Sequence, residues 1–327
     1  MNFKKKNIFV TGGAGYIGSV LVNLLLSKGY KITVLDNLLH GYNPLVNINS
    51  DNLIFVEGDI RDKATVENVI NNQDVVVHLA AIVGEPACNK NQELTHSTNK
   101  IGSEILLQAT LEKKIEKFIF VSTCSNYGIM SDNADCVDEN SPLKPISIYS
   151  ETKVEFENLL LNNKIENFYP VVLRFATVYG TSPRMRFDLT VNEFTKELYL
   201  GRELEIFGEQ FWRPYCHTKD IARACQIAIE SDSSVAYQAF NVGATDENFQ
   251  KKEIVNKIIK QMPEKENLIK FVEKNRDPRN YKVSFEKIKK ILNFVPDYNV
   301  DYGIEEIIKT LDSDLFDNPD ASKYRNI

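Results

Sequence analysis

Tyr149 and Lys153 are the two residues whose types and spacing point most directly to chemistry. Because they are four positions apart, a helix would place the phenol and the ammonium group one turn apart on the same face. A tyrosine with its ordinary pKa near ~10 is a poor base at neutral pH, but a neighbouring lysine and a cationic nicotinamide would lower that pKa. The phenolate can then remove the proton of a hydroxyl group while a hydride leaves the same carbon. Thr123, at the end of a predicted strand, can hydrogen-bond to that hydroxyl.

The stretch from Ile8 to Ser19 predicts the cofactor site that this chemistry needs, since a tyrosine and a lysine at this spacing also occur on ordinary helix surfaces. Its first three residues are apolar, as is typical of a strand buried on both faces of a parallel sheet. Glycines follow at positions 12, 15 and 18, before an apolar helical segment. They allow a tight turn, a close approach to a pyrophosphate, and packing of the helix against the strand. Strand, glycine turn and helix in this order predict a dinucleotide-phosphate cradle.

Asp36 predicts which dinucleotide this cradle binds. It ends a second predicted strand, 31–35, and lies 18 residues after Gly18, close to the spacing of about 20 residues expected of a ribose-binding acid. A carboxylate there accepts hydrogen bonds from ribose hydroxyls and repels a 2′-phosphate, which favours NAD over NADP. A solvated aspartate at a strand end is the alternative interpretation. Asp59, after the next predicted strand, can meet an adenine edge.

The order of the remaining elements predicts an α/β fold with a Rossmann-type, doubly wound parallel sheet. Polar residues cluster at the strand ends, where such a sheet binds its ligands. After residue 176 the strands become short and the apolar periodicity becomes helical, which predicts a smaller mixed α/β substrate-binding lobe. The predicted regions are an NAD-binding Rossmann domain at 1–176, a substrate lobe at 177–311 that is partly interleaved with it, and a polar, poorly ordered tail at 312–327. The further strands and helices are expected at 53–56, 74–79, 99–112, 117–121, 148–161 and 170–173.

Composition argues against several classes of protein. The 327 residues carry a net charge of −6, whereas a nucleic-acid-binding surface is basic. No apolar stretch approaches the ~18 residues of a membrane span. The five cysteines are odd in number and scattered, without a Cys-x-x-Cys pair, so neither a metal site nor a disulfide framework is expected. A reduced, cytoplasmic location is the simplest expectation.

The motifs together resemble the extended short-chain dehydrogenases/reductases of the nucleotide-sugar epimerase/dehydratase family, from about residue 7 to residue 310. The resemblance implies NAD as cofactor, a nucleotide-diphospho-sugar as substrate, a homodimer, and catalytic roles for Thr123, Tyr149 and Lys153. The motifs that carry it are Thr11-Gly-Gly-Ala-Gly-Tyr-Ile-Gly18, Asp36-Asn37, Gly58-Asp59, His78-Leu-Ala-Ala81, Asn99, Tyr149 with Lys153, and Arg174 through Gly180. The residues that it assigns to the cofactor are Gly12, Gly15, Tyr16, Ile17, Asp36, Asn37, Asp59, Ile60, Leu79, Ala80, Ala81, Asn99, Tyr149 and Lys153.

The same resemblance implies a substrate site. Arg213 matches a family arginine that binds the sugar-nucleotide diphosphate, and Arg279 matches a second one less closely. Two guanidinium groups suit a pyrophosphate because each can form a two-point contact; exposed arginines in salt bridges are the alternative. The complete predicted substrate set is Thr123, Cys124, Ser125, Thr177, Arg186, Asn192, Arg213 and Arg279.

Departures from the family pattern bear on the reaction and the substrate. Cys124 and Ser125 stand where the 4,6-dehydratases carry Asp-Glu, so dehydration lacks its usual acid and base. Thr177 replaces a common asparagine, and the stretch 182–188 introduces Arg184 and Arg186. We expect this stretch to determine the sugar, which the sequence leaves open.

The predicted activity is NAD-dependent oxidation of a ring hydroxyl of the nucleotide-sugar, at C4, as part of an epimerisation. A C4 dehydrogenase or ketoreductase that releases a 4-keto sugar uses the same residues and is the alternative. A non-catalytic NAD-binding sensor is the third possibility, although it would have little need for Thr123, Tyr149 and Lys153 together.

Overall fold

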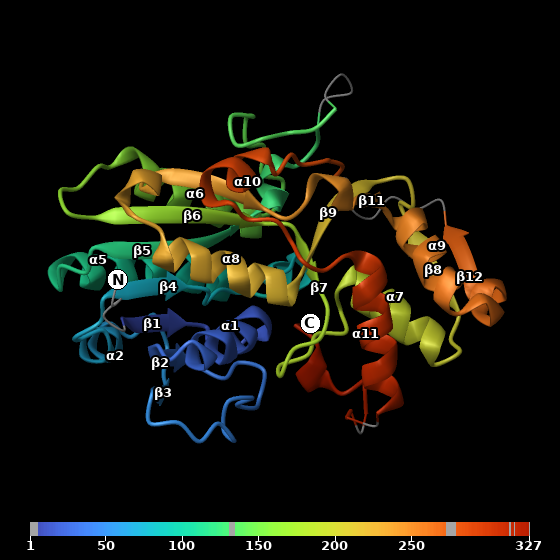
Figure 1. Cartoon of the computed structure of the whole chain (residues 1–327), viewed down its shortest axis with the longest axis horizontal. Helices are drawn as coiled ribbons and strands as arrows, with labels where there is room; N and C mark the ends of the chain where they lie inside the picture. The colour runs from blue at the N-terminus through green and yellow to red at the C-terminus, as the bar shows by residue number, and fades with distance from the viewer. Residues whose placement is uncertain (1–5, 131–134, 273–278, 314, 317, 327) are drawn as a thin grey trace.

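A computed structural model describes residues 6–130, 135–272, 279–313, 315–316 and 318–326. Parts of the predicted regions 1–176, 177–311 and 312–327 therefore lie outside the described residues. The chain forms a large lobe around a parallel sheet and a smaller lobe beside it (Figure 1).

The large lobe is built on a seven-stranded sheet in the order β10-β6-β5-β4-β1-β2-β3. Every neighbouring pair in it is parallel. Apolar runs such as Ile8-Phe9-Val10, which is fully buried, form strands that must be covered on both faces. The predicted doubly wound sheet is confirmed. Its strands are β1 (Asn7–Thr11), β2 (Lys31–Asp36), β3 (Leu53–Glu57), β4 (Val75–His78), β5 (Lys117–Thr123), β6 (Tyr169–Phe175) and β10 (Gln238–Val242).

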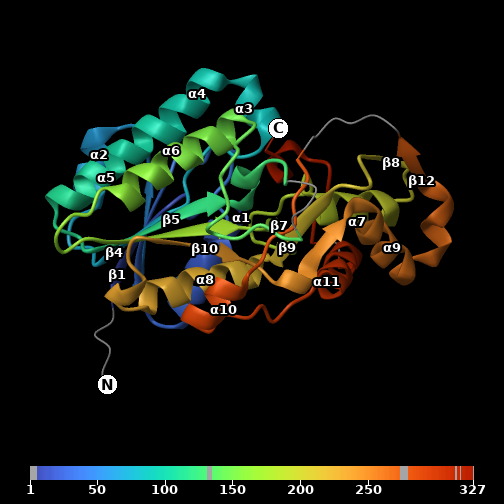
Figure 2. The ribbon, with the colours of Figure 1, turned by 90° about the horizontal axis from the view of Figure 1, so that it is seen from above.

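Helices cover both faces of this sheet (Figure 2). Buried side chains of α2 (Lys63–Val69), α5 (Ser103–Glu112) and α6 (Ile148–Asn162) form the core on one face. Those of α1 (Tyr16–Ser27), α8 (Thr218–Glu230) and α10 (Glu286–Leu292) form the core on the other. The predicted helix 99–112 is in fact the end of a π-helical turn, followed by α5. The segments before α5 are α3 (Glu85–Lys90), α4 (Gln92–His96) and the π-helical η1 (Ser97–Gly102).

The smaller lobe mixes short strands and helices, as predicted. One sheet has the order β11-β9-β7, with β7 parallel and β11 antiparallel to β9, and β12 pairs with β8 in another. The chain after residue 176 also returns to the large lobe through α8, β10 and α10. The strands are β7 (Thr177–Tyr179), β8 (Leu204–Phe207), β9 (Trp212–His217), β11 (Asn248–Gln250) and β12 (Ile269–Val272). The helices are α7 (Thr190–Tyr199), α9 (Lys251–Gln261) and α11 (Val300–Asp312). The 3₁₀ turns of the chain are η2 (Cys124–Tyr127), η3 (Ser233–Val235), η4 (Thr245–Glu247), η5 (Pro263–Leu268) and η6 (Ser322–Tyr324).

The C-terminal tail packs against the smaller lobe. Tyr324 is only 7% exposed, and its ring meets those of Phe187 and Phe316 edge-on, at centroid distances of 6.1 and 5.0 Å. The carbonyl of Tyr324 accepts a hydrogen bond from the N–H of Phe187 at 2.9 Å. Tyr324 is thus buried within an otherwise polar segment, and the expected poor order of the tail stays a prediction.

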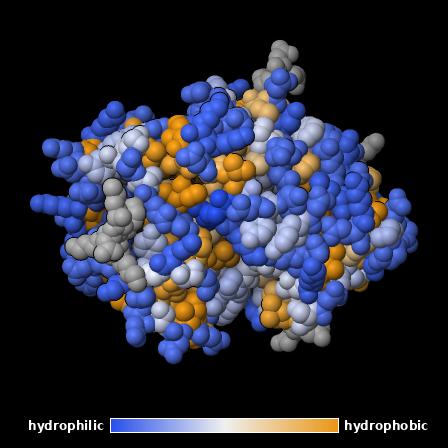
Figure 3. All heavy atoms as spheres, viewed as in Figure 1, coloured by the Kyte–Doolittle hydropathy of each residue, from blue (hydrophilic) through white to orange (hydrophobic). Residues whose placement is uncertain are grey.

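The surface in Figure 3 is mostly polar, with apolar patches between the polar side chains, one of them over α8 and α10. Ile291 and Val295, at and just beyond the end of α10, are 45% and 51% exposed. No helix in the described part of the chain is long and apolar enough to cross a membrane.

The stability of the smaller lobe is expected to depend on pH through Glu247. Burial raises the pKa of this carboxyl group to about 7, although it accepts a hydrogen bond from the N–H of Val300 at 2.8 Å. The folded state therefore binds the proton more tightly than the unfolded state does. This contribution to stability is present at low pH and is lost as the pH rises through the raised pKa.

Urea denaturation at about pH 5 and about pH 8 tests this linkage. We expect the free energy of unfolding to fall less between these pH values in Glu247→Gln than in the wild type. Glu266→Gln removes an exposed carboxylate of the same lobe and should keep the wild-type pH dependence. The same pH dependence in Glu247→Gln and the wild type would contradict the prediction.

Candidate functional site

A cavity of about 440 Å³ lies where the two lobes meet. It begins at the glycine turn after β1, passes the carboxyl ends of β2, β4 and β5, and reaches residues of β7, β9 and the segment 182–190. This is the position at which an open, doubly wound sheet binds its ligands.

The glycine turn is shaped for close contact with a phosphate. Gly12 has a φ of +73°, and a Cβ atom on it would lie 2.6 Å from the backbone nitrogen of Ala80. A Cβ atom on Gly18 would lie 2.1 Å from the carbonyl oxygen of Gly12. Gly15 is the N-cap of α1 and has no side chain to satisfy the first N–H groups of the helix. The exposed helix N-terminus behind a glycine turn fits the diphosphate of NAD.

Gly18→Ala is expected to weaken NADH binding by more than about tenfold, because a close backbone approach cannot relax without moving the helix that binds the phosphate. The clash is with a backbone oxygen, not with the end of a flexible side chain. Fluorescence titration with NADH measures the effect. Ser27→Ala, at the exposed end of the same helix, is the control and should bind NADH as the wild type does. Unchanged affinity in Gly18→Ala would show that the helix is not held against this turn.

Asp36 lies at the other end of the cradle, at the carboxyl end of β2. Its Oδ2 accepts the N–H of Ala14 and its Oδ1 the N–H of Leu38, both at 2.9 Å. Burial raises the pKa of Asp36, and these two hydrogen bonds oppose the shift. Each carboxylate oxygen keeps a lone pair for a ribose hydroxyl.

Asn37 and Asp59 extend the same end of the cavity. The amide of Asn37 donates to Asp59 at 3.1 Å, and Arg61 forms an ion pair with Asp59 at 2.8 Å. Hydrogen bonds from Arg61 lower the pKa of Asp59 to about 2, against the effect of burial. Asp59 is therefore held as an anion beside the predicted adenosine site.

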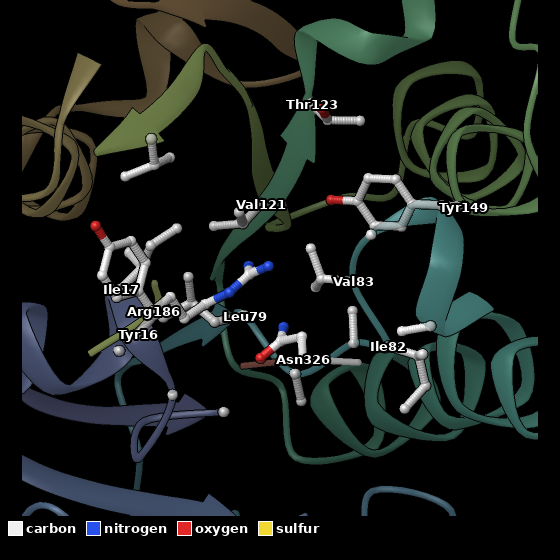
Figure 4. Close-up of a pocket in the computed structure, with 18 of the residues that line it drawn as sticks. Tyr16, Ile17, Leu79, Ile82, Val83, Val121, Thr123, Tyr149, Arg186 and Asn326 are labelled. Carbon is white, nitrogen blue, oxygen red and sulfur yellow. The ribbon is translucent and has the colours of Figure 1, made fainter. Parts of the chain in front are cut away.

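Tyr149, Lys153 and Thr123 come together at the carboxyl end of β5. The capping box of Ser147 and Ser150 starts α6, and the first two turns of this helix present Tyr149 and then Lys153 to the cavity. The Nζ atom of Lys153 donates to the carbonyl of Val121 at 2.8 Å and lies 5.9 Å from the centre of the Tyr149 ring. Figure 4 shows the phenol of Tyr149 and the side chain of Thr123 at the same end of the cavity.

The pKa values at this end are governed by burial. Burial lowers the pKa of Lys153 to about 8, against the charge of Glu157. Burial raises the pKa of Tyr149 above its ordinary value, and the charges of Arg186 and Arg279 oppose this only in part. In the polypeptide alone, burial therefore outweighs the lowering of the Tyr149 pKa that the sequence led us to expect from Lys153.

A buried ion pair lies behind these residues. Glu157, one turn after Lys153, pairs with Arg174 of β6 at 2.6 Å. Glu157 also accepts hydrogen bonds from Ser122 of β5 and, at 2.8 Å, from Asn126. One carboxylate thus joins α6 to β5 and β6, the elements that carry the candidate catalytic groups.

The opposite wall carries the arginines expected at the substrate. Arg213 lies over the ring of Tyr281, 5.2 Å from its centre, and donates to the carbonyl of Arg279. Arg279 reaches Ser125 at 3.5 Å and Glu85 at 3.9 Å. Both guanidinium groups line the cavity near Thr123, so they are placed to receive a diphosphate next to the catalytic end.

Most of the predicted site residues line this one cavity. Those assigned to the cofactor do so with the exception of Asn99, and those assigned to the substrate do so with the exceptions of Cys124 and Asn192. The predicted residues that line it are Gly12, Gly15, Tyr16, Ile17, Asp36, Asn37, Asp59, Ile60, Leu79, Ala80, Ala81, Thr123, Ser125, Tyr149, Lys153, Thr177, Arg186, Arg213 and Arg279.

Asn99, Cys124 and Asn192 are not among the residues that line the cavity, and their contact with a ligand stays a prediction. Asn99 exchanges two hydrogen bonds with the backbone of Ile82, at 2.8 and 3.0 Å. The thiol of Cys124 is 1% exposed and donates to the carbonyl of Arg174 at 3.3 Å; burial raises its pKa well above the ordinary value. These side chains form hydrogen bonds within the protein, and the spacing of residues in the sequence does not predict such bonds.

Asn192 instead ties together the segment that carries the second pair of arginines. Its amide donates to the carbonyl of Arg186 at 2.8 Å and to the hydroxyl of Tyr16 at 3.0 Å, and it accepts the N–H of Gly180 at 3.0 Å. It supports the wall from outside.

Several cavity residues were not predicted from the sequence. His40 and Tyr42 follow the strand that ends at Asp36, and Tyr281 follows Arg279, so proximity to a predicted residue was the available signal. Asn326 lies close to the C-terminus, and no motif marks it. Only the fold brings it to the cavity.

The comparisons with known proteins agree with this geometry. A profile described as the NAD dependent epimerase/dehydratase family matches residues 8–243. The chain is 29% identical over 313 residues to a UDP-glucose 4-epimerase of Halalkalibacterium halodurans, covering 89% of this chain and 91% of that protein. It is 28% identical over 317 residues to a dTDP-glucose 4,6-dehydratase of Streptomyces niveus, with 92% and 91% covered.

A solved structure extends the likeness to three dimensions. The UDP-glucose 4-epimerase of Thermotoga maritima, crystallised with UDP-glucose, superposes with a TM-score of 0.83 at 28% identity. The match covers 95% of this chain and all of that one. The proteins similar to this chain thus include enzymes of two reaction types.

Proposed function

Because the chain belongs to the NAD-dependent epimerase/dehydratase family, we propose that it epimerises C4 of a nucleotide-diphospho-sugar. NAD is its cofactor. The observation that carries the proposal is that Tyr149, Lys153 and Thr123 share one cavity with the glycine turn. A protein that only senses NAD would not need a buried tyrosine and lysine beside the cofactor.

The roles of the side chains follow from their positions. NAD, when bound, would supply the acceptor of the hydride and, once reduced, its donor for the return step. Tyr149 takes the proton of the ring hydroxyl, and Thr123 hydrogen-bonds to the same oxygen. The ammonium of Lys153 stabilises the phenolate. Inversion requires the oxidised ring to turn over, after which Tyr149 returns the proton to the oxygen.

Arg213 and Arg279 are proposed to hold the diphosphate of the substrate while the sugar turns. Both line the wall that faces Thr123 and Ser125, and a guanidinium can bind a phosphate by two hydrogen bonds. Dehydration is not proposed, because Cys124 and Ser125 follow Thr123 without a carboxylate and burial raises the pKa of the Cys124 thiol.

A substrate panel tests the reaction. The purified full-length protein is incubated with UDP-, GDP-, CDP- and dTDP-sugars, and the products are analysed by mass spectrometry and NMR. A new isomer of unchanged mass is the expected result. Loss of two hydrogens would replace the epimerase by the dehydrogenase alternative, and loss of water would contradict the argument from Cys124 and Ser125.

We also propose that the protein is a homodimer that associates through η1 and α6. Ile101 and Leu159 on these elements are apolar and yet 44% and 38% exposed, and Lys100 and Glu155 join the two elements at 2.8 Å. Light scattering is expected to show a dimer in the wild type and a monomer in Ile101→Asp. Val46→Asp, at a loop residue that is 72% exposed, should stay dimeric. A monomeric wild type would overturn this proposal.

A further inference from the structure

The stretch 182–188 and the last described residues, 320–326, meet at the cofactor end of the cavity. We propose that residues 320–326, here called the C-terminal strap, belong to the NAD site because they hold Arg184 where its guanidinium binds the cofactor's diphosphate. The inference rests on the NAD site and not on the reaction that the enzyme performs.

Arg184 is a buried cation whose hydrogen-bonding capacity is only partly used. Its side chain lines the cavity, yet the residue is only 2% exposed. Within the described residues its Nε atom has no hydrogen-bond partner, and no salt bridge joins it to a carboxylate. Burial lowers its pKa to about 10. Burying an incompletely paired guanidinium is costly, and a bound phosphate would offset that cost with charge-assisted hydrogen bonds.

The stretch that carries Arg184 is fastened to the first turn of α1, directly after the glycine turn. The hydroxyl of Ser182 donates to the carbonyl of Tyr16 at 2.6 Å and lies 3.0 Å from the hydroxyl of Ser19. Tyr42 donates to the carbonyl of Pro183 at 3.2 Å. Arg184 therefore follows directly after a segment that is bound to the first turn of α1, where the diphosphate of a dinucleotide lies.

The positive charge of Arg184 acts on titratable groups of the segment 36–40, at the carboxyl end of β2. Burial raises the pKa of Asp36, and the positive charge of Arg184 opposes that shift. Burial lowers the pKa of His40 to about 4, and Arg184 adds to the lowering. The arginines of the substrate wall, Arg213 and Arg279, lie instead beside Ser125 and Tyr281. Arg184 thus has different neighbours from Arg213 and Arg279 within the same cavity.

The C-terminal strap holds this arginine through its backbone. The carbonyl of Arg325 accepts a hydrogen bond from Nη2 of Arg184 at 3.0 Å. The N–H of Asn326 donates to Asp188 at 3.2 Å, and Asp188 in turn holds Arg186 by hydrogen bonds of 3.0 and 2.7 Å. Figure 4 shows Arg186 and Asn326 in the cavity together with Ile17 and Leu79.

Two contacts keep the strap in place. Tyr324 is packed among aromatic rings that include Phe187 and Phe316. Asp320 pairs with Lys196, whose side chain is fully buried, at 2.8 Å, and with Arg202 at 2.6 Å. The strap is therefore anchored to the smaller lobe through Asp320 and Tyr324, and its residue Asn326 lines the cavity.

Binding of NADH, NADPH and UDP, followed by fluorescence and calorimetry, tests the assignment of Arg184. Arg184→Gln is expected to raise the Kd of NADH by about tenfold or more, the loss expected for a hydrogen bond to a charged group. The Kd of UDP should not change, because the diphosphate of UDP is proposed to bind Arg213 and Arg279 instead. Unchanged NADH affinity in Arg184→Gln would overturn the proposal. A loss of UDP affinity, or of NADPH affinity alone, with NADH affinity unchanged would overturn it as well.

A chain that ends at Pro319 tests the strap. It is expected to weaken NADH binding as Arg184→Gln does, and adding Arg184→Gln to it should cause no further loss because both changes remove the same contact. Leu315→Ala, at a residue of the tail that lies outside the strap and is 69% exposed, is the control and should bind NADH as the wild type does. Fully additive losses, or tight NADH binding by the shortened chain, would show that the strap does not act through Arg184.

Folding is checked by circular dichroism in each variant. If the shortened chain does not fold, Tyr324→Ala, which removes only the aromatic anchor, takes its place with the same expected loss of NADH affinity. Because every readout is binding, failure of this proposal leaves the epimerase assay untouched, and failure of the epimerase assay leaves these measurements valid.

Discussion

Replacing Tyr149 by phenylalanine is expected to lower kcat by about 10²–10⁴-fold, the usual contribution of a positioned general base. The phenol faces the reacting end of the cavity from the first turn of α6, one turn before Lys153. Phenylalanine keeps the ring and its packing but cannot accept a proton. Turnover of the sugar identified by the substrate panel measures the effect.

Two measurements show whether the loss is chemical. NADH affinity should be the same in Tyr149→Phe and the wild type, because the glycine turn and Asp36 are untouched. Tyr30→Phe removes a phenol that bonds to Glu230 away from the cavity and should retain full activity. Full activity in Tyr149→Phe would remove this residue from the mechanism.

Glu157→Gln is expected to lower the free energy of unfolding by about 3–5 kcal/mol, the cost of leaving the partner of a buried ion pair without its counter-charge. The side chains of Glu157 and Arg174 are 1% and 5% exposed, so water cannot replace the lost partner. Urea denaturation at neutral pH measures the difference.

The same helix provides a matched control. Glu155 pairs with Lys100 at 2.8 Å, but its side chain is 56% exposed, and Glu155→Gln should cost no more than about 1 kcal/mol. The charge of Glu157 also opposes the lowering of the Lys153 pKa, so any activity retained by Glu157→Gln should show its alkaline limb at lower pH. Equal stability losses in the two variants would contradict the role of burial.

The sheet could be predicted because its strands are buried on both faces. Such strands read as continuous apolar runs, and each run predicted from 8–10 onward overlaps an observed strand, although 74–79 extends beyond β4 at both ends. Boundaries were less accurate, because the residues that extend β5 to Thr123 and β6 to Phe175 are held by pairing with each other and not by local pattern. The π-helical turn before α5 depends likewise on contacts, with Asn99 held by the backbone of Ile82.

The residues predicted for the cofactor end line one cavity, and the sequence could group them for a related reason. Glycines that must lack a Cβ atom, and an acid at a fixed distance behind them, are local requirements that spacing records. The sequence contains no comparable spacing signal for residues whose position depends on distant neighbours. Cys124 and Asn192 stand in the expected stretches, yet neither lines the cavity, because their neighbours in space rotate them into the interior.

The sequence by itself determined the fold class, the NAD cradle and the grouping of Tyr149 with Lys153, since each depends on residues close together in the chain. The tertiary structure decided what residues far apart do to one another. It joined Arg184 to the carbonyl of Arg325, and it brought Asn326 of the C-terminal strap to the cavity next to the buried ring of Tyr324. The contact with Arg184 is made by a backbone carbonyl, and every residue carries the same carbonyl group. The pattern of side chains in the sequence therefore could not predict it.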